Sequence, residues 1–140
     1  MGGAVKVRDR MTTGLITVNV DQPIREAWDL VEGRKLRRFP VLSNGKLVGI
    51  VTDRDLRNAT ASSVVLTERK YQDYLLDSIK IESIMTPDPV TISPDADLRD
   101  AAKSLLRLKV GGLPVVEQGR LSGIITETDM IEALVDLLPD

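Results

Sequence analysis

The sequence contains two copies of one unit, related by an offset of 74 residues. From Val7 to Arg57 the copies align without a gap, and 15 of the 51 aligned pairs are identical. Eleven of the remaining 36 pairs place an apolar residue opposite an apolar one. A repeated unit of this size buries little surface alone and gains stability by packing on its neighbour. We therefore expect two small units that pack together, with two quasi-equivalent clefts where they meet.

Both copies have the same predicted order of elements: strand, helix, strand, strand, helix. Apolar residues recur at helical spacing after the first strand, and Asn44-Gly45 joins the next two strands by a strong hairpin signal. The second copy has Gln118-Gly119 at that point. The predicted strands cover 15–18, 39–42 and 47–51 in the first copy and 90–92, 113–116 and 121–125 in the second. The pattern predicts an α+β fold of two β-α-β-β-α repeats related by pseudo-twofold symmetry.

The repeats also divide the chain. Repeat 1 is predicted over 7–60 and repeat 2 over 81–138, with an inter-repeat segment over 61–80 that has no counterpart. Thr67 is a candidate cap for a helix in this segment. That helix would carry one apolar face, which consists of Tyr71, Tyr74, Leu75 and Ile79. Such a helix is too apolar for a free linker, so we expect it to pack on the repeats.

The composition excludes several classes of function. The chain has no Cys, which excludes disulfides and thiolate metal sites, and no His, which removes the usual general base and the commonest metal ligand. It also lacks a phosphate-binding loop and a nucleophile elbow, so an enzyme is disfavoured. No apolar run approaches the roughly 20 residues that span a bilayer, and the first residues lack a signal-peptide core. We expect a cytoplasmic protein with no membrane segment.

The charge is unevenly distributed. The net charge is −2, but residues 1–58 carry +4 and residues 59–140 carry −6. The basic excess is concentrated in residues 34–38. This stretch is interpreted as a solvated helix end, an ion-paired interface or an anion site. Nucleic-acid binding through this stretch is disfavoured by the overall acidity and by the small number of aromatic residues. The aromatic residues are Trp28, Phe39, Tyr71 and Tyr74.

Three motifs occur twice, in the same order. They are Met-Thr with a following Val-Thr run, Pro-Val before the hairpin, and Gly-Ile-(Val/Ile)-Thr-x-x-Asp at 49–55 and 123–129. With these motifs the chain resembles the tandem cystathionine-β-synthase (CBS) domain family, the CBS pair, over about residues 7–137. The segment from Tyr71 to Leu76 is most similar to the CBS pairs of acetoin-utilisation-type bacterial proteins, which carry a further domain. By that comparison the chain is a stand-alone module or part of a longer protein.

The resemblance implies a function. CBS pairs are regulatory modules that bind adenine nucleotides (AMP, ADP or ATP) or S-adenosylmethionine, usually as homodimers, and that control another protein. The resemblance therefore implies an adenosine-type regulatory ligand, with Mg²⁺ present only as a companion of a triphosphate. The regulated protein is not identified by the sequence. The alternative is a structural dimerisation module whose clefts bind no small molecule.

The Thr-x-x-Asp motif carries the implied ligand contacts. In the family, the Asp bonds the ribose hydroxyls and the Thr lies near the phosphate, which assigns these roles to Thr52 with Asp55 and Thr126 with Asp129. A carboxylate can accept two neighbouring hydroxyl groups at once, and a helix N-terminus favours a phosphate. The competing interpretation is that the motif only caps the helix that follows. Both roles are compatible.

The resemblance further implies that each cleft uses residues of both copies. One candidate site consists of Arg37, Arg38, Ile50, Thr52, Asp55, Thr86 and Val90. The other consists of Thr12, Ile16, Ile124, Thr126 and Asp129. For the apolar members of both sets, plain strand core is the competing interpretation. Trp28 is interpreted as helix core rather than as a stacking platform.

The two candidate clefts differ in charge. In the family, residues just before the Pro-Val strand reach the phosphates; here they are Arg37 and Arg38 in the first copy but Gly111 and Gly112 in the second. Arginine can clamp a phosphate with two hydrogen bonds, whereas glycine offers only its backbone N–H. We therefore predict that the Asp55 cleft prefers a charged nucleotide, and that the Asp129 cleft takes a less charged ligand or stays empty.

Overall fold

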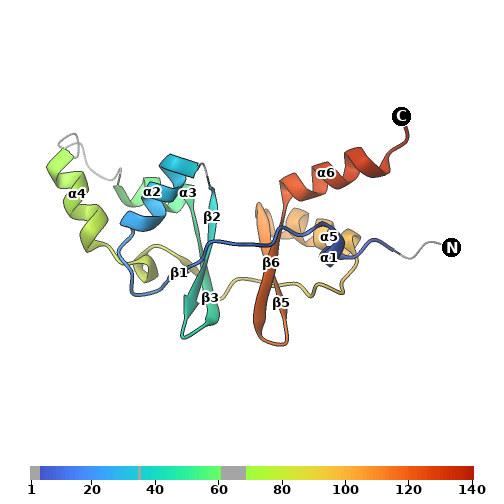
Figure 1. The fold of residues 1–140 in the computed structure, drawn as a ribbon, viewed down its shortest axis with the longest axis horizontal. Helices are drawn as coiled ribbons and strands as arrows, with labels where there is room; N and C mark the ends of the chain where they lie inside the picture. The colour runs from blue at the N-terminus through green and yellow to red at the C-terminus, as the bar shows by residue number, and fades with distance from the viewer. Residues whose placement is uncertain (1–3, 35, 61–68) are drawn as a thin grey trace. The chain divides into compact units, whose positions relative to one another are not determined.

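The computed structural model describes residues 4–34, 36–60 and 69–140, and it divides the chain into two compact units (Figure 1). One unit, called here the Asp55 unit, is continuous and contains Ile16–Pro89. The other, the Asp129 unit, combines Met1–Leu15 with Val90–Asp140. The units therefore do not coincide with the sequence repeats, because each repeat gives its leading segment to the unit built on the other repeat.

The Asp55 unit is built on a four-stranded sheet in the order β1-β2-β3-β4. Its strands are β1 (Val18–Asn19), β2 (Arg38–Ser43), β3 (Lys46–Thr52) and β4 (Thr86–Pro87). β1 pairs with β2 in parallel, and the other pairings are antiparallel. Asn44 and Gly45 both have positive φ, of 51° and 78°, as a two-residue hairpin turn requires. The predicted hairpin is confirmed, while the first strand is shorter than expected and begins only at Val18.

Helices cover one face of this sheet. They are α2 (Arg25–Arg34), α3 (Asp53–Thr60) and α4 (Arg69–Ser78), with a short 3₁₀ turn, η2 (Ile81–Ser83). Alternation along the strands directs Phe39, Val41 and Val51 to the helices, where they are fully buried. The helices and η2 complete the core with Ile24, Ala27, Leu56, Leu76 and Ile81. Trp28 packs at the edge of this core, in agreement with its interpretation as helix core.

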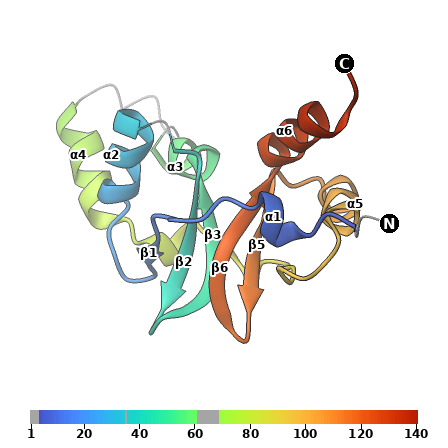
Figure 2. The same cartoon turned by 45° about the vertical axis from the view of Figure 1, so that its right-hand side comes forward.

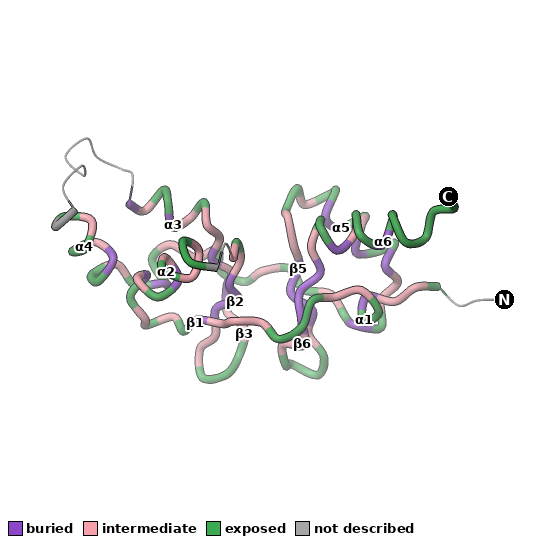
Figure 3. Tube along the Cα trace, turned by 45° about the horizontal axis from the view of Figure 1, so that its top comes forward, coloured by how far each residue is buried: buried purple, intermediate pink, exposed green. Residues whose placement is uncertain are grey.

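The Asp129 unit repeats the same local structure. It contains α1 (Val7–Arg10), α5 (Leu98–Leu108), β5 (Gly112–Glu117), β6 (Arg120–Thr126) and α6 (Glu127–Leu137). Ile92 bridges to Val115 in parallel and Thr12 bridges to Ile124 in antiparallel, which corresponds to β1 and β4 of the other unit. Buried residues of this unit lie mainly in the strands and on the inner faces of α1 and α5, whereas α6 is largely exposed (Figure 3). The α+β fold of two related repeats is confirmed.

The segment between the repeats forms α4, which packs on α2 and α3 (Figure 2). The predicted helix is confirmed, and Ile79 just after it packs against the core as expected, but the two tyrosines were wrongly assigned to the buried face. Leu76 is the anchor, at 3% exposed, whereas Tyr71 and Tyr74 are 43% and 63% exposed. The two tyrosine rings instead contact each other, with centroids 6.2 Å apart. Thr67, the candidate cap, lies outside the described residues.

Arg25 of α2 fixes α4 from its solvent side. Its Nε lies 2.5 Å from Asp77 Oδ1, and its Nη2 lies 3.3 Å from Asp73 Oδ1. The hydrogen bond from Arg25 holds the pKa of Asp77 below its ordinary value. Because the carboxyl has a lower pKa in the folded protein, the pair stabilises the fold at pH values above about 3.9, the ordinary value for Asp. That contribution is lost as the pH falls through the lowered pKa.

This linkage predicts a pH-dependent effect of Arg25→Gln. The melting temperature of this variant should lie below that of the unmodified protein by a constant amount between pH 7 and 5, and the difference should shrink below about pH 4. Thermal unfolding by circular dichroism measures it, with Arg99→Gln as the matched control at the equivalent position of the other repeat. A difference that widens in acid would contradict the assignment.

Candidate functional site

Each Thr-x-x-Asp motif forms a reciprocal pair of hydrogen bonds where a strand enters a helix. In the Asp55 unit, the Thr52 N–H donates to Asp55 Oδ2 at 2.9 Å, and the Asp55 N–H donates to Thr52 Oγ1 at 3.2 Å. The Asp129 unit has the same pair between Thr126 and Asp129, at 2.8 and 3.2 Å. This geometry is a capping box, so the capping interpretation is correct for both motifs. It leaves the second carboxylate oxygen, Oδ1, outside the cap in each case.

The cap lies at the end of a sheet face opposite the helical core. Directly paired residues of antiparallel strands share a face, and the pairs here are Arg38 with Thr52 and Ile50 with Thr86. Val51, the neighbour between Ile50 and Thr52, points the other way into the core. Arg38, Ile50, Thr52 and Thr86 therefore share one face of the sheet, beside Asp55.

The Asp129 unit has an equivalent face with different chemistry. Gly112 pairs with Thr126, at the position where Arg38 pairs with Thr52, and Thr12 bridges to Ile124. The glycine places no side chain beside the Thr-x-x-Asp turn. The cationic group present on the first face is therefore missing from the second.

The two aspartates also differ in their partners. Thr12 Oγ1 donates to Asp129 Oδ1 at 2.9 Å, so both oxygens of this carboxylate are bonded within the unit. Asp129 is only 8% exposed. Asp55 is half-buried, and no described residue donates to its Oδ1. Among the described residues, Asp55 Oδ1 thus has no donor, whereas Asp129 Oδ1 already accepts one hydrogen bond, from Thr12. The sequence does not signal this difference, because the equivalent positions Thr12 and Thr86 are both threonine.

The two arginines of the predicted site lie in different surroundings. Arg38 is half-buried on the face described above. Arg37 is exposed and lines a groove of about 480 Å³ with Leu36 and with residues of α2 and α3, among them Asp53. Its carbonyl accepts a hydrogen bond from the Asp53 N–H, at 2.9 Å. The side chains of Arg34 and Lys35, which belong to the same basic stretch, lie outside what the structure describes.

Val90 and Ile16 do not belong to the same unit as the other residues of their predicted sites. Val90 is 50% exposed and belongs to the Asp129 unit, whereas the other six members of its predicted site belong to the Asp55 unit. Ile16 belongs to the Asp55 unit and packs against that unit's core. The structure brings the polar members of each site together within one unit. For Val90 and Ile16, as for every other member of the two sites, the ligand contact stays a prediction.

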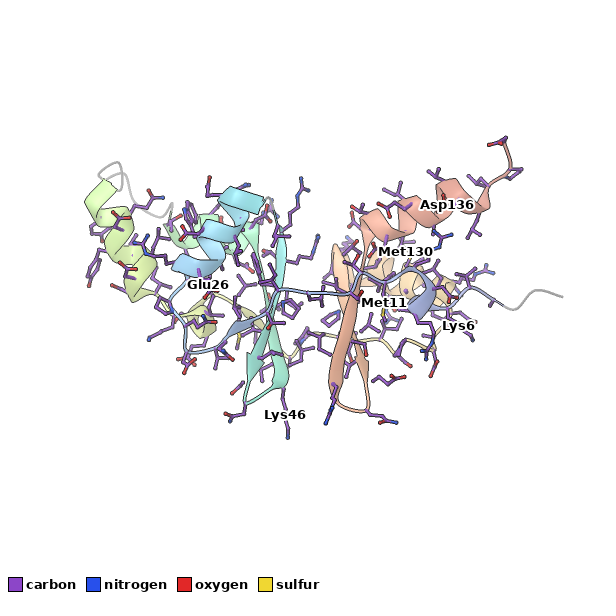
Figure 4. The ribbon with its side chains drawn as sticks, viewed as in Figure 1. Lys6, Met11, Glu26, Lys46, Met130 and Asp136 are labelled. Carbon is purple, nitrogen blue, oxygen red and sulfur yellow. The ribbon has the colours of Figure 1, made fainter. Side chains whose placement is uncertain are left out.

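In each unit, one glycine allows another segment to lie close to the hairpin, and the sequence alone did not identify these two glycines. A Cβ on Gly123 would lie 2.6 Å from the carbonyl oxygen of Thr12, and a Cβ on Gly49 would lie 2.5 Å from Met85 Sδ. These glycines let the leading segment of one repeat lie against the hairpin of the other. Figure 4 labels Met11, which also approaches Gly123, together with Met130 and Asp136 on α6. The sequence contained one signal for these contacts, because Met-Thr and Gly-Ile both recur at the 74-residue offset.

The profile of the CBS domain family matches the chain twice, over residues 7–62 and 81–136. The chain belongs to the CBS domain family. As a CBS pair it is 38% identical to a CBS domain-containing protein of Dictyostelium discoideum over 136 residues, which is 96% of this chain and 94% of the relative. It covers only 45% of another relative, MJ0188 of Methanocaldococcus jannaschii, at 32% identity.

Solved CBS-pair structures have the same fold. CBSX2 in complex with AMP has a TM-score of 0.82 at 30% identity, with 96% of this chain and 99% of that chain covered. The acetoin utilisation protein AcuB from Vibrio cholerae has a TM-score of 0.78 at 31% identity, with 96% and 93% covered. The CBS pair of MJ0100, in complex with 5-methylthioadenosine and S-adenosyl-L-methionine, has a TM-score of 0.79 at 26% identity, with 96% and 98% covered. The resemblance to acetoin-utilisation CBS pairs is confirmed.

Two other features were sought in the described part of the chain. No group of three or more carboxylates there is placed to hold a metal ion. None of its helices is long and apolar enough to cross a bilayer.

Proposed function

We propose that this CBS pair is a regulatory module that senses an adenosine-type ligand, an adenine nucleotide or S-adenosylmethionine. The observation that carries the proposal is the Oδ1 of Asp55, to which no described residue donates, beside Thr52 and Arg38 on one sheet face. A ribose diol needs a carboxylate acceptor and a phosphate needs a cation, and this face offers both. Similar CBS pairs have been solved with AMP, 5-methylthioadenosine and S-adenosyl-L-methionine, which supports the ligand class.

In the proposed complex, Asp55 accepts hydrogen bonds from the ribose hydroxyls and the N-terminus of α3 faces the phosphate. Arg38 binds the phosphate from the paired strand, and Arg37 adds positive charge from the neighbouring groove. Ile50 contacts the adenine, and Thr86 and Val90 come from the second repeat. These roles involve binding only, so we infer a sensor without catalytic activity.

The second site, with Thr12, Ile16, Ile124, Thr126 and Asp129, is proposed to be the weaker one. The Thr12 hydroxyl already donates to the Asp129 oxygen that a ribose would use, so a bound ligand shares or replaces that bond. Gly112 offers a phosphate no side-chain charge. We therefore infer that an uncharged or zwitterionic ligand binds here in preference to a nucleotide, or that the site stays empty.

Removing the charge of Arg38 tests its role. We expect Arg38→Gly, which copies Gly112, to lower the affinity for ATP by about tenfold or more, because a charge-assisted phosphate contact is lost. The affinity for adenosine, which has no phosphate, should change less than twofold. Isothermal titration calorimetry measures both. Equal losses for ATP and adenosine would show that Arg38 does not contact the phosphate.

A second candidate function is structural dimerisation. Ile131 and Val135 lie one turn apart on α6 and are 61% and 70% exposed, so they form an uncovered apolar stripe. We propose that this stripe contributes to a homodimer. Sedimentation of Val135→Asp tests the dimer, because a charge in the interface should shift the protein to monomer.

Melting temperature separates the sensor from a purely structural module. Ligand at 1 mM that binds with a Kd of about 10 μM stabilises the native state by about 2.7 kcal/mol, which raises the melting temperature by about 8 °C in a protein of this size. AMP, ADP, ATP and S-adenosylmethionine are the ligands to test, with GMP as the control. No shift with any of the four would favour the structural module.

A further inference from the structure

Just before α2 and just before α5, the chain makes the same two backbone contacts with the short entry segment that precedes the other repeat. Each entry point carries a backbone hydrogen bond and an antiparallel bridge, and the two sets differ by the repeat offset. The Ile24 N–H donates to the Ile79 carbonyl at 2.9 Å, and the Leu98 N–H donates to the Val5 carbonyl at 2.8 Å. The bridges are Pro23–Lys80 and Lys6–Asp97. Val5 is therefore the structural equivalent of Ile79.

Upstream of this point the units differ. In the Asp55 unit, the chain before Ile79 is α4, which packs on α2 and α3 (Figure 2). Leu76 enters the core, and Asp73 and Asp77 bind Arg25. In the Asp129 unit, the helices equivalent to α2 and α3 are α5 and α6. Among the described residues, no helix covers their surface at the equivalent position.

This surface is an apolar groove of about 510 Å³, called here the α5–α6 groove. Its walls come from the entry segment, α5 and α6, and the central lining residues are Val5, Leu98, Ala102, Ala133, Leu134 and Leu137. Leu134 and Leu137 are more than half exposed. On α6 and just after it, Leu134 and Leu138 of the groove adjoin the stripe of Ile131 and Val135, because the four residues follow helical spacing.

The groove has one cation at its edge. Arg99 lines the groove, is exposed, and occupies the position of Arg25 in the other repeat. Arg25 binds two carboxylates of α4, whereas Arg99 forms no ion pair with any residue that the structure describes. The groove thus keeps both features that hold α4 in the other unit, the apolar floor and the arginine, without the helix.

We propose that the α5–α6 groove binds an amphipathic helix of a partner protein that has the chemistry of α4. The required pattern is an aliphatic residue that enters the groove, with carboxylates three residues before it and one residue after it, as Asp73, Leu76 and Asp77 are spaced. The carboxylates bind Arg99 and the aliphatic residue covers Leu98 and Ala133. This recognition is independent of the proposed nucleotide site and links the module to a regulated protein.

A peptide with the sequence of residues 69–80 is the probe, because it carries this pattern. It is labelled with fluorescein and titrated against the full chain up to about 1 mM, with fluorescence anisotropy as the readout. We expect saturable binding. Arg99→Glu should weaken it by about tenfold or more, and a peptide with Asp73→Arg and Asp77→Arg should bind Arg99→Glu better than it binds the unmodified protein. Circular dichroism checks that the variant is folded.

Arg25→Glu is the matched control, since the same peptide could displace α4 from the Asp55 unit. Binding that is lost in Arg25→Glu but kept in Arg99→Glu would overturn the proposal, as would no binding at the highest concentration. If a second copy of the chain covers the groove, Leu134→Asp should dissociate a dimer that excludes the peptide. That result would also overturn the partner-helix proposal.

Discussion

Asp55→Ala is expected to lower the affinity for AMP by at least about tenfold, whereas Asp129→Ala should leave it within about twofold. The first variant removes a carboxylate oxygen that is free to accept ribose hydroxyls, and a charged hydrogen bond contributes about 1.5–3 kcal/mol. The second removes a carboxylate that Thr12 already occupies. Isothermal titration calorimetry with AMP measures both affinities.

These variants control for each other. Each loses the carboxylate that accepts the Thr N–H in the cap at the start of a helix, which costs about 1 kcal/mol of stability. Asp129→Ala also loses the bond from Thr12, so its ligand-free melting curve should show at least as large a loss as that of Asp55→Ala, and a larger fall in AMP affinity in Asp55→Ala is then not a folding effect. A larger affinity loss in Asp129→Ala than in Asp55→Ala would reverse the proposed order of the sites.

Gly123→Ala is expected to destabilise the protein by about 2 kcal/mol, with a fall in melting temperature of about 6 °C. Its Cβ would lie 2.6 Å from the Thr12 carbonyl oxygen, and backbone cannot move aside as a side chain can. The Thr12 segment would therefore separate from β6. Thermal unfolding gives the overall loss. Hydrogen exchange at the Thr12 amide, which bonds the Ile124 carbonyl at 2.8 Å, gives the local one.

Gly49→Ala is the matched substitution in the other unit. The nearest atom to its Cβ is Met85 Sδ, at the flexible part of a side chain, and the Thr86 carbonyl oxygen is farther away at 3.0 Å. We expect a loss of about 1 kcal/mol, smaller than for Gly123→Ala. Equal stability of Gly123→Ala and the unmodified protein would mean that the Thr12 segment does not lie against β6.

The sequence was sufficient to predict the elements because their signals are local. The Asn44-Gly45 turn, the alternation in β2 and β3, and the helical spacing around Ala27 each depend on near neighbours in the chain. The Thr-x-x-Asp motif is equally local, and both of its interpretations could be stated before the structure was known. The offset between the copies added the family resemblance.

Long-range features could not be predicted in this way. Nothing local indicates that Thr86 pairs with Ile50, or that Thr12 bonds Asp129 while Thr86 leaves Asp55 free. The face of α4 was misassigned because tyrosines score as apolar, although Leu76 is the residue that fits the core. Such outcomes depend on which segments meet, and spacing along the chain does not contain that information.

The central claim is that the duplicated sites have diverged and that the one at Asp55 binds the nucleotide. Native mass spectrometry of the unmodified protein in the presence of AMP tests it most directly, because the number of bound molecules per chain is counted. We expect one AMP per chain to saturate first, with the same single adduct in Asp129→Ala and none in Asp55→Ala. Two molecules that bind with equal affinity, or one that survives in Asp55→Ala, would contradict this account.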